Sequence, residues 1–124
     1  MDKGLEHTSM QVVDFANTAR SLGSGDMEVL ATPAMVSLME NAAMKAVAGE
    51  LAEGETTVGS MINTTHIKPS AIGEIVKATA TLTAVEGKKL TFHVVAKVGE
   101  DVIGEGEHIR YIVNKEKFLA KMNS

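Results

Sequence analysis

The sequence predicts an α+β fold in which a long, curved antiparallel sheet wraps around one central apolar helix, and three observations lead to it. A helical segment over residues 31–47 is apolar on almost every side, which is typical of a buried helix. After residue 55 the hydrophobic period changes from helical to alternating, which is typical of half-buried strands. Short turns join the last three alternating segments, so these strands run antiparallel. We expect a single domain over residues 1–124.

The first elements are a strand, a loop and the helix. Residues 8–16 (TSMQVVDFA) are expected to form a short strand, and the glycines of residues 21–30 (SLGSGDMEVL) mark a loop. Thr32 is a good N-cap and Pro33 a good first helical residue, while Gly49 is a plausible end of the helix. At about 100° per residue, one wide helix face carries Met35, Leu38, Met39, Ala42, Ala43 and Ala46.

Four strands are expected to follow, over residues 56–67, 74–85, 90–98 and 102–113. Within residues 74–85, small and branched apolar side chains alternate with lysine and threonine, so one face of that strand is apolar. The remaining residues form a short tail with a single helical turn. One sheet and one helix leave strand edges and apolar surface uncovered, so we expect a homodimer that extends the sheet. Whether such dimers pair into a dimer of dimers stays open.

Composition argues against several classes of protein. The net charge is −4 and the twelve lysines and arginines are scattered, which is unlike a nucleic-acid-binding protein. There is no cysteine, which excludes disulfides, thiolate zinc sites and cysteine nucleophiles. There is no apolar run of membrane-spanning length and no signal-peptide core, so we expect a soluble cytoplasmic protein. The histidines are too dispersed for a metal site and the glycines match no phosphate or dinucleotide motif, so no metal or cofactor is expected.

Glu40 is the first candidate catalytic residue, because it falls on the apolar side of the predicted helix, about 140° from Met35. Burying a lone carboxylate is costly, and a desolvated glutamate makes a competent general base near neutral pH. Alternatively, Glu40 reaches solvent at the helix edge or pairs with a lysine. Its position in the sequence favours neither interpretation.

Thr32 and His66 are the other candidate side chains. Thr32 is either a helix cap, or a hydroxyl that acts as a nucleophile or as a donor to the substrate. His66, near a strand end, is either structural or a proton donor or base. Eight residues separate Thr32 from Glu40, about 12 Å along a straight helix, so they do not touch directly within a straight helix. Of the other histidines, His7 is expected in a loose end, His93 on the outer sheet face, and His108 either solvated or, with Arg110, binding an anion.

Gly59 lies inside a predicted strand, which suggests a β-bulge or a close approach of the backbone to a ligand. A free amide at this position could bind a carbonyl oxygen, as the donors of an oxyanion hole do. Simple strand packing explains the glycine equally well.

Three stretches, residues 23–43, 53–96 and 103–121, form a familiar combination, because an ATPA…ME helix is followed at the expected separation by a TTVG…H strand. On these residues the chain resembles the hotdog-fold acyl-CoA thioesterases, and within them the fluoroacetyl-CoA thioesterase-like group. The resemblance implies a helix wrapped by a long antiparallel sheet, and hydrolysis of a thioester to a carboxylate and free coenzyme A.

The same resemblance implies roles for single residues. It places the catalytic threonine, glutamate and histidine of the family on Thr32, Glu40 and His66, and the glycine that holds the thioester carbonyl on Gly59. We expect the acyl chain to lie against the helix, near Met35, between two subunits. Coenzyme A phosphates would need cations at the mouth of the site, for which the candidates are Lys68, Lys88, Lys89 and Arg110.

The loop before the helix departs from the fluoroacetyl-specific pattern, in which aromatic residues gate the site. Here residues 25–30 read GDMEVL and offer Met27 and Leu30 instead. The expected substrate is therefore a short- or medium-chain acyl-CoA. Two alternatives stay open: a non-catalytic acyl-CoA sensor, and an enoyl-thioester hydratase, whose differently spaced aspartate–histidine pair is not found in the sequence.

Overall fold

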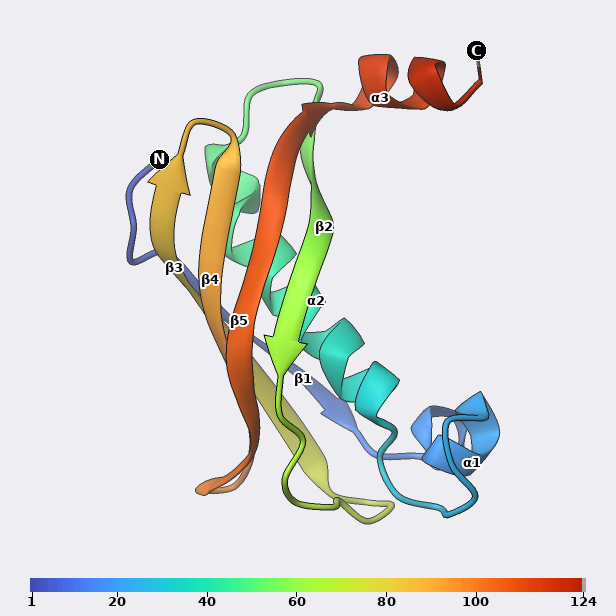
Figure 1. Ribbon diagram of the computed structural model, residues 1–124. Coiled ribbons are helices and arrows are strands. Elements are labelled where there is room, and N and C mark those ends of the chain that lie inside the picture. The colour runs from blue at the N-terminus through green and yellow to red at the C-terminus, as the bar shows by residue number, and fades with distance from the viewer. Residues whose placement is uncertain (124) are drawn as a thin grey trace.

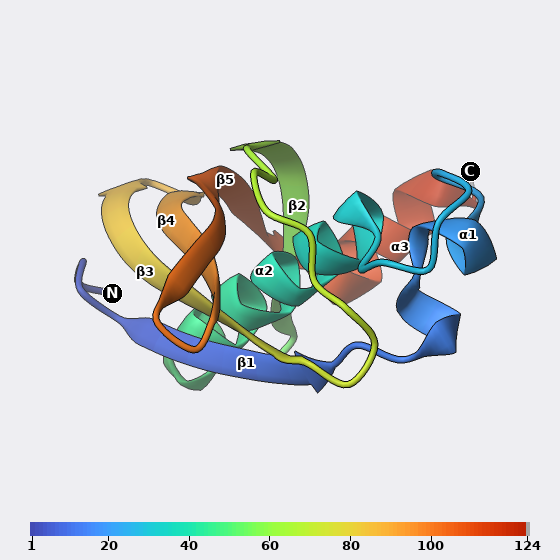
Figure 2. The ribbon, with the colours of Figure 1, turned by 90° about the horizontal axis from the view of Figure 1, so that it is seen from below.

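The computed structural model describes residues 1–123, and in that range a five-stranded antiparallel sheet curves around a 16-residue helix, α2 (Figures 1 and 2). The strand order across the sheet is β1-β3-β4-β5-β2, so β1 and β2 form its edges. The predicted fold class is confirmed. The elements are β1 (Glu6–Val12), α1 (Ala19–Leu22), α2 (Thr32–Val47), β2 (Glu55–Thr64), β3 (Ile75–Glu86), β4 (Lys89–Val98), β5 (Asp101–Asn114) and α3 (Lys115–Met122).

The hydrophobic core lies between one face of α2 and the concave face of the sheet. The helix packs mainly on β1 and β3 and, to a smaller extent, on β4. Buried and exposed residues alternate along β3 and β4, as the sequence pattern predicts. The largest buried side chains include Met35 and Met39 from the helix and Leu82 and Phe92 from the sheet. Methionines and small residues thus fill a core that has few aromatic rings.

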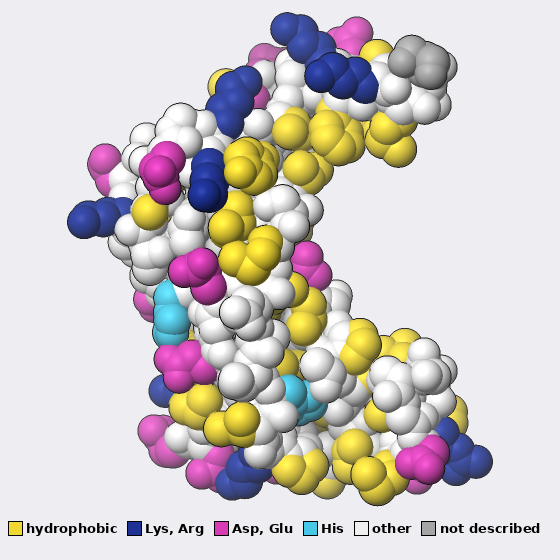
Figure 3. Space-filling model, in the orientation of Figure 1, with side chains coloured by type: hydrophobic (Ala, Val, Ile, Leu, Met, Phe, Trp, Pro, Cys, Tyr) yellow, Lys and Arg dark blue, Asp and Glu magenta, His cyan; other side chains and the backbone are white. Residues whose placement is uncertain are grey.

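The opposite side of α2 is not covered by the sheet of its own chain. Val36 and Glu40 are half-buried there, and Met44 is exposed. Helix α3 projects away from the sheet at the end of β5 (Figure 1), and it exposes Phe118 and Leu119. Figure 3 shows that the surface between the projecting α3 and the α1 region is hollowed and has apolar side chains along it.

Two glycines of β5 allow the chain beyond β2 to lie close to this strand. A Cβ atom at Gly104 or at Gly106 would meet the carbonyl oxygen of Thr65 or of Asn63, respectively. The amide of Thr65 donates to the Glu105 carbonyl at 3.1 Å, and the amide of Ile67 donates to the Ile103 carbonyl at 2.7 Å. The segment that carries His66 is therefore fixed to β5 on both sides of the histidine.

The structure corrects the sequence prediction at several boundaries. β1 lies over Glu6–Val12 instead of residues 8–16, because Asp14 caps a helical turn at Phe15–Asn17. The helix α1, which the sequence did not predict, overlaps the start of the expected loop at residues 21 and 22, and the Thr18 side chain accepts a hydrogen bond from the amide of Ser21 at its start. The tail forms the two-turn helix α3 instead of one turn. Among the described residues, no helix has the length and apolar character needed to cross a membrane.

Candidate active site

The hydroxyl of Thr32 lies 2.7 Å from Nδ1 of His66. Thr32 is the first helical residue of α2, and the N-cap is Ala31, so the prediction that Thr32 caps the helix is wrong. The start of the helix is held beside the His66 segment because the amide of Leu30 donates to the Ser70 carbonyl at 3.0 Å. This arrangement leaves the Thr32 hydroxyl free of the helix backbone and directs it to the imidazole.

The His66 ring is held in its neutral form. Burial lowers its pKa below the usual 6.5, and the nearby backbone of Lys68 opposes this shift only in part. Nε2 of His66 is buried, and no described residue forms a hydrogen bond with it. A neutral imidazole with an unprotonated Nδ1 can accept a proton from the threonine hydroxyl and so act as a general base.

A cavity of about 380 Å³ opens beside this pair. Its lining includes Thr32 and His66, together with the apolar side chains of Met27, Leu30 and Pro69. Pockets of this size accept small organic ligands. The polar pair thus meets an apolar space where an acyl group can be placed.

Glu40 lies two turns further along α2, about 12 Å from Thr32 along the helix axis, and it belongs to a second group of polar residues. A Cβ atom built on Gly59 would lie 3.0 Å from Oε2 of Glu40, 3.2 Å from Cε1 of His108 and 3.4 Å from Nη1 of Arg110. Glu40, His108 and Arg110, which together form the Glu40 group, therefore converge on the space beside the Cα atom of Gly59. Glu40 itself is half-buried and does not line the cavity beside Thr32.

Gly59 marks a bulge in β2, as its sequence position suggested. It pairs with Arg110 of β5, whereas Met61 pairs with the adjacent Ile109, so Ser60 is the extra residue of the bulge. Gly59 is exposed in this edge strand. A larger residue would push against Glu40, which gives a structural reason for glycine at this place.

Arg110 is buried, and this contradicts its expected position among the cations at a solvent-exposed mouth. Nε of Arg110 donates to Oγ1 of Thr57 at 2.8 Å, and Nη2 donates to the Thr57 carbonyl at 3.0 Å. Burial lowers the pKa of Arg110, and Glu40 opposes that shift, so the guanidinium and the carboxylate interact electrostatically. Lys68, another expected mouth cation, forms an ion pair with Asp101 at 2.7 Å.

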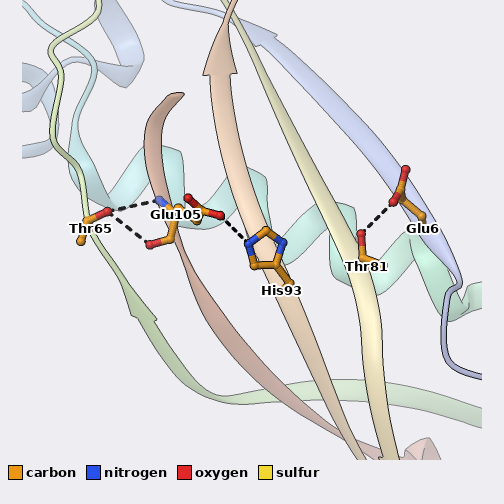
Figure 4. Close-up of polar contacts among 5 residues, drawn as sticks. All are labelled: Glu6, Thr65, Thr81, His93 and Glu105. Carbon is orange, nitrogen blue, oxygen red and sulfur yellow. Dashed lines mark hydrogen bonds and ion pairs between the residues drawn. The ribbon is translucent and has the colours of Figure 1, made fainter. Parts of the chain in front are cut away.

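The structure also places the remaining residues that the sequence singled out. Met35 is completely buried, would contact a side chain at Gly104, and does not line the cavity beside Thr32. His7 lies in β1 and pairs with Ala80 of β3, which corrects its expected place in a loose end. His93 lies on the outer sheet face, as predicted, and its Nε2 lies 2.7 Å from Oε2 of Glu105 (Figure 4).

His108 is the residue whose position the sequence left open, and the structure places it beside Gly59 with Glu40 and Arg110. It is completely buried, which rules out the solvated alternative. The signal was the spacing of His108 and Arg110, because residues two apart on a strand share one face. Among residues 1–123, histidine, aspartate and glutamate side chains form no group of three that could hold a metal ion.

Comparison with known proteins identifies the family. A family model described as fluoroacetyl-CoA-specific thioesterase matches residues 13–116. A fluoroacetyl-CoA thioesterase of Streptantibioticus cattleyicolor is 44% identical over 95 residues, which are 77% of this chain and 68% of that protein.

Solved structures agree with this assignment. The fluoroacetyl-CoA thioesterase FlK has a TM-score of 0.92 at 39% identity, covering 99% of this chain and 96% of that chain. A thioesterase superfamily member from Thermus thermophilus has a TM-score of 0.91 at 31% identity, covering 98% and 90%. A hot-dog-like protein from Thermanaerovibrio acidaminovorans, 21% identical with a TM-score of 0.88 over 97% and 89%, shares the fold. The chain therefore belongs to the fluoroacetyl-CoA-specific thioesterase family, hotdog-fold enzymes that hydrolyse acyl-CoA thioesters.

Proposed function

We propose that this chain hydrolyses a short- or medium-chain acyl-CoA thioester to a carboxylate and free coenzyme A, using Thr32, His66, Glu40 and Gly59. The observation that carries the proposal is the 2.7 Å contact between Thr32 Oγ1 and His66 Nδ1 at the wall of a cavity. A threonine hydroxyl needs an adjacent base to become a nucleophile, and a neutral histidine at this distance can accept its proton.

Acyl transfer begins at Thr32. Its oxygen attacks the thioester carbonyl while His66 takes the hydroxyl proton, and the carbon–sulfur bond then breaks as that proton passes to the departing thiolate. Water hydrolyses the acyl-threonine: Glu40 removes a proton from the water as it attacks, and this proton passes to the Thr32 oxygen when the bond between that oxygen and the acyl carbon breaks. In a second route Glu40 activates a water that attacks the thioester directly, and Thr32 only donates a hydrogen bond to the substrate.

Negative charge that develops on the thioester oxygen needs stabilisation during both steps. We expect the Gly59 amide to donate a hydrogen bond to this oxygen, and the fixed charge of Arg110 beside it to add electrostatic stabilisation. We expect the acyl chain to lie against α2 at the cavity beside Thr32, while Met35 packs within the core on the side of α2 that faces the sheet.

The proposed substrate follows from the cavity beside Thr32. Met27 and Leu30 give it flexible aliphatic walls beside the ring of Pro69, and its described lining contains no phenylalanine. We therefore expect no preference for fluoroacetyl-CoA over acetyl-CoA. Because the sequence has no cysteine, it fits a reducing compartment, and we propose the cytoplasm.

The site also requires a second subunit, because Thr32 and Glu40 are about 12 Å apart on one helix. We propose a homodimer in which two β2 edges pair antiparallel and extend the sheet. Because the paired strands run in opposite directions, we expect the Glu40 group of one copy to lie closer to the Thr32–His66 pair of the other copy than to the pair in its own chain. The uncovered side of α2 and the apolar surface of α3 support this contact.

Mixed dimers test the shared site. Differently tagged Thr32→Ala and Glu40→Gln subunits are refolded together, and the mixed dimer is purified. If each site takes Thr32 and Glu40 from different subunits, one site is intact and the mixed dimer recovers about half of the wild-type kcat. Two inactive sites would instead mean that both groups act within one subunit.

A panel of acyl-CoA esters with a thiol reagent tests the hydrolysis itself. The wild type should release thiol from a short or medium ester, and Glu40→Gln and His66→Ala should each lose about 100-fold of kcat or more. His93→Ala is the matched control, because this histidine lies on the outer face of the sheet. Tight binding without thiol release would support the sensor, and hydration of an enoyl-CoA without thiol release would support the hydratase.

A further inference from the structure

The buried ring of His108 forms a hydrogen bond at each of its two nitrogens. Nδ1 lies 2.8 Å from the carbonyl oxygen of Met61, which belongs to the bulge next to Gly59. A carbonyl oxygen can only accept, so Nδ1 of His108 carries the proton. The ring also packs at a centroid distance of 6.1 Å from Phe92, which fixes its plane within the core.

The second nitrogen makes a different kind of contact. Nε2 of His108 lies 3.2 Å from Nη1 of Arg110. A guanidinium can only donate, so Nε2 must offer a lone pair. Both hydrogen bonds therefore require the same form of the ring, which is neutral and protonated on Nδ1.

The charges around His108 are consistent with this neutral form. Arg110 on β5 is the neighbouring cation, Glu40 on α2 is the neighbouring anion, and β2 and β4 contribute the Met61 carbonyl and Phe92. Burial lowers the pKa of His108, with Arg110 acting in the same direction, whereas the Met61 hydrogen bond and Glu40 oppose the shift. The net effect keeps a second positive charge away from the guanidinium.

Arg110 is consequently held at both sides of its guanidinium. Thr57 accepts two hydrogen bonds from Nε and Nη2, and His108 accepts one from Nη1. Because the pair is buried and both ring nitrogens are occupied, His108 is not available to bind an external anion. Its remaining effect on the site runs through Arg110, which lies across Gly59 from Glu40.

We propose that His108 is a positioning residue of this site, which as a neutral ring protonated on Nδ1 holds the Arg110 guanidinium beside Glu40 and Gly59. The proposal rests on the function proposed above. It assigns no contact between His108 and the substrate. It predicts that His108 influences kcat through the placement of Arg110 and leaves substrate binding almost unchanged.

Three substitutions separate the two hydrogen bonds. His108→Phe keeps a ring but removes both, and we expect kcat to fall about 10- to 100-fold with KM changed by less than about twofold. His108→Gln keeps an acceptor for Arg110 and should recover most of the lost kcat. His108→Asn keeps a donor to the Met61 carbonyl and should recover thermal stability but not kcat. His93→Phe, on the outer face, is the control that should leave kcat unchanged.

The dependence on Arg110 is tested in an Arg110→Met background, where His108→Phe should lower kcat by no more than about twofold further. Nitrogen NMR of the histidine rings in the wild type should show Nδ1 protonated and Nε2 unprotonated for His108. This measurement needs no substrate, so it tests the inference even if no acyl-CoA is hydrolysed. A ring protonated on Nε2, a full additional loss in the Arg110→Met background, or wild-type kcat in a folded His108→Phe protein would overturn the proposal.

Discussion

The Gly59→Ala substitution tests the arrangement of the Glu40 group with a single methyl. Its Cβ atom would lie 3.0 Å from Glu40 Oε2, 3.2 Å from His108 Cε1 and 3.4 Å from Arg110 Nη1. His108 is held at both ring nitrogens and Arg110 by three hydrogen bonds, so these two residues resist displacement. The end of the Glu40 side chain is the part that can move. We therefore expect its carboxylate to shift by a few tenths of an ångström.

The two consequences of that shift differ in size. Overpacking by one methyl costs about 1 kcal/mol when a side-chain end can give way, which lowers Tm by about 4 °C in a chain of this length. A displaced base loses its alignment with the water or the substrate, and we expect kcat to fall about 10- to 100-fold. The loss of activity should thus greatly exceed the loss of stability.

Thermal unfolding and thiol release on the best acyl-CoA measure these two quantities in the same preparation. Gly49→Ala is the matched control, because a Cβ atom at Gly49 meets no atom within 4 Å. It should leave kcat unchanged and Tm unchanged or slightly raised. Wild-type kcat in Gly59→Ala would refute the argument that this methyl meets the catalytic carboxylate.

Four further outcomes are expected. Thr32→Ala should remove nearly all activity. It should change the free energy of unfolding in urea by less than about 0.5 kcal/mol, because the Thr32 side chain is exposed and does not cap the helix. A loss of stability near 1 kcal/mol would instead indicate a helix cap. Burial lowers the pKa of His66 below 6.5, so the acid limb of kcat/KM should lie below pH 6.5, and a midpoint above that value would contradict a buried neutral base. Because of the same shift, His66 takes up a proton at a higher pH in the unfolded chain than in the folded protein, so the free energy of unfolding should fall as pH falls below 6.5. Unfolding experiments on His66→Ala should show a weaker dependence of this free energy on pH. Gly106→Ala should destabilise the protein by about 3 kcal/mol, because the new methyl meets the Asn63 carbonyl, and an unchanged urea midpoint would show that β2 can move aside.

The fold was largely predictable because its pattern is local. Alternation along β3 and β4 and the apolar face of α2 are direct consequences of periodicity, and both are confirmed. The boundaries were harder, because short polar side chains decide them. Thr18 caps α1, a short helix just before the glycines of the predicted loop, where the sequence predicted no helix. Thr32 stands where a cap is expected, yet its hydroxyl contacts a histidine 34 residues away in the chain.

The polar residues of the site were harder to assign than the fold. The bulge at Gly59 is one of the alternatives that the sequence left open, because a glycine inside a strand is unusual. The sequence could not decide whether His108 and Arg110 are buried, since charged residues on a strand usually face solvent. Their burial depends on Thr57 and Met61 of β2, and only the strand pairing brings these acceptors to them. Long-range pairing of this kind leaves no signal in local periodicity.

The central claim is that Thr32, His66 and Glu40 serve one thioester hydrolysis. The most direct test compares kcat for thiol release with the Kd of a non-hydrolysable thioether analogue of the acyl-CoA, in the wild type, Thr32→Ala and Glu40→Gln. The account predicts that both variants lose about 100-fold of kcat or more while Kd changes by less than about threefold. Wild-type kcat in either variant, with the analogue still bound, would contradict it.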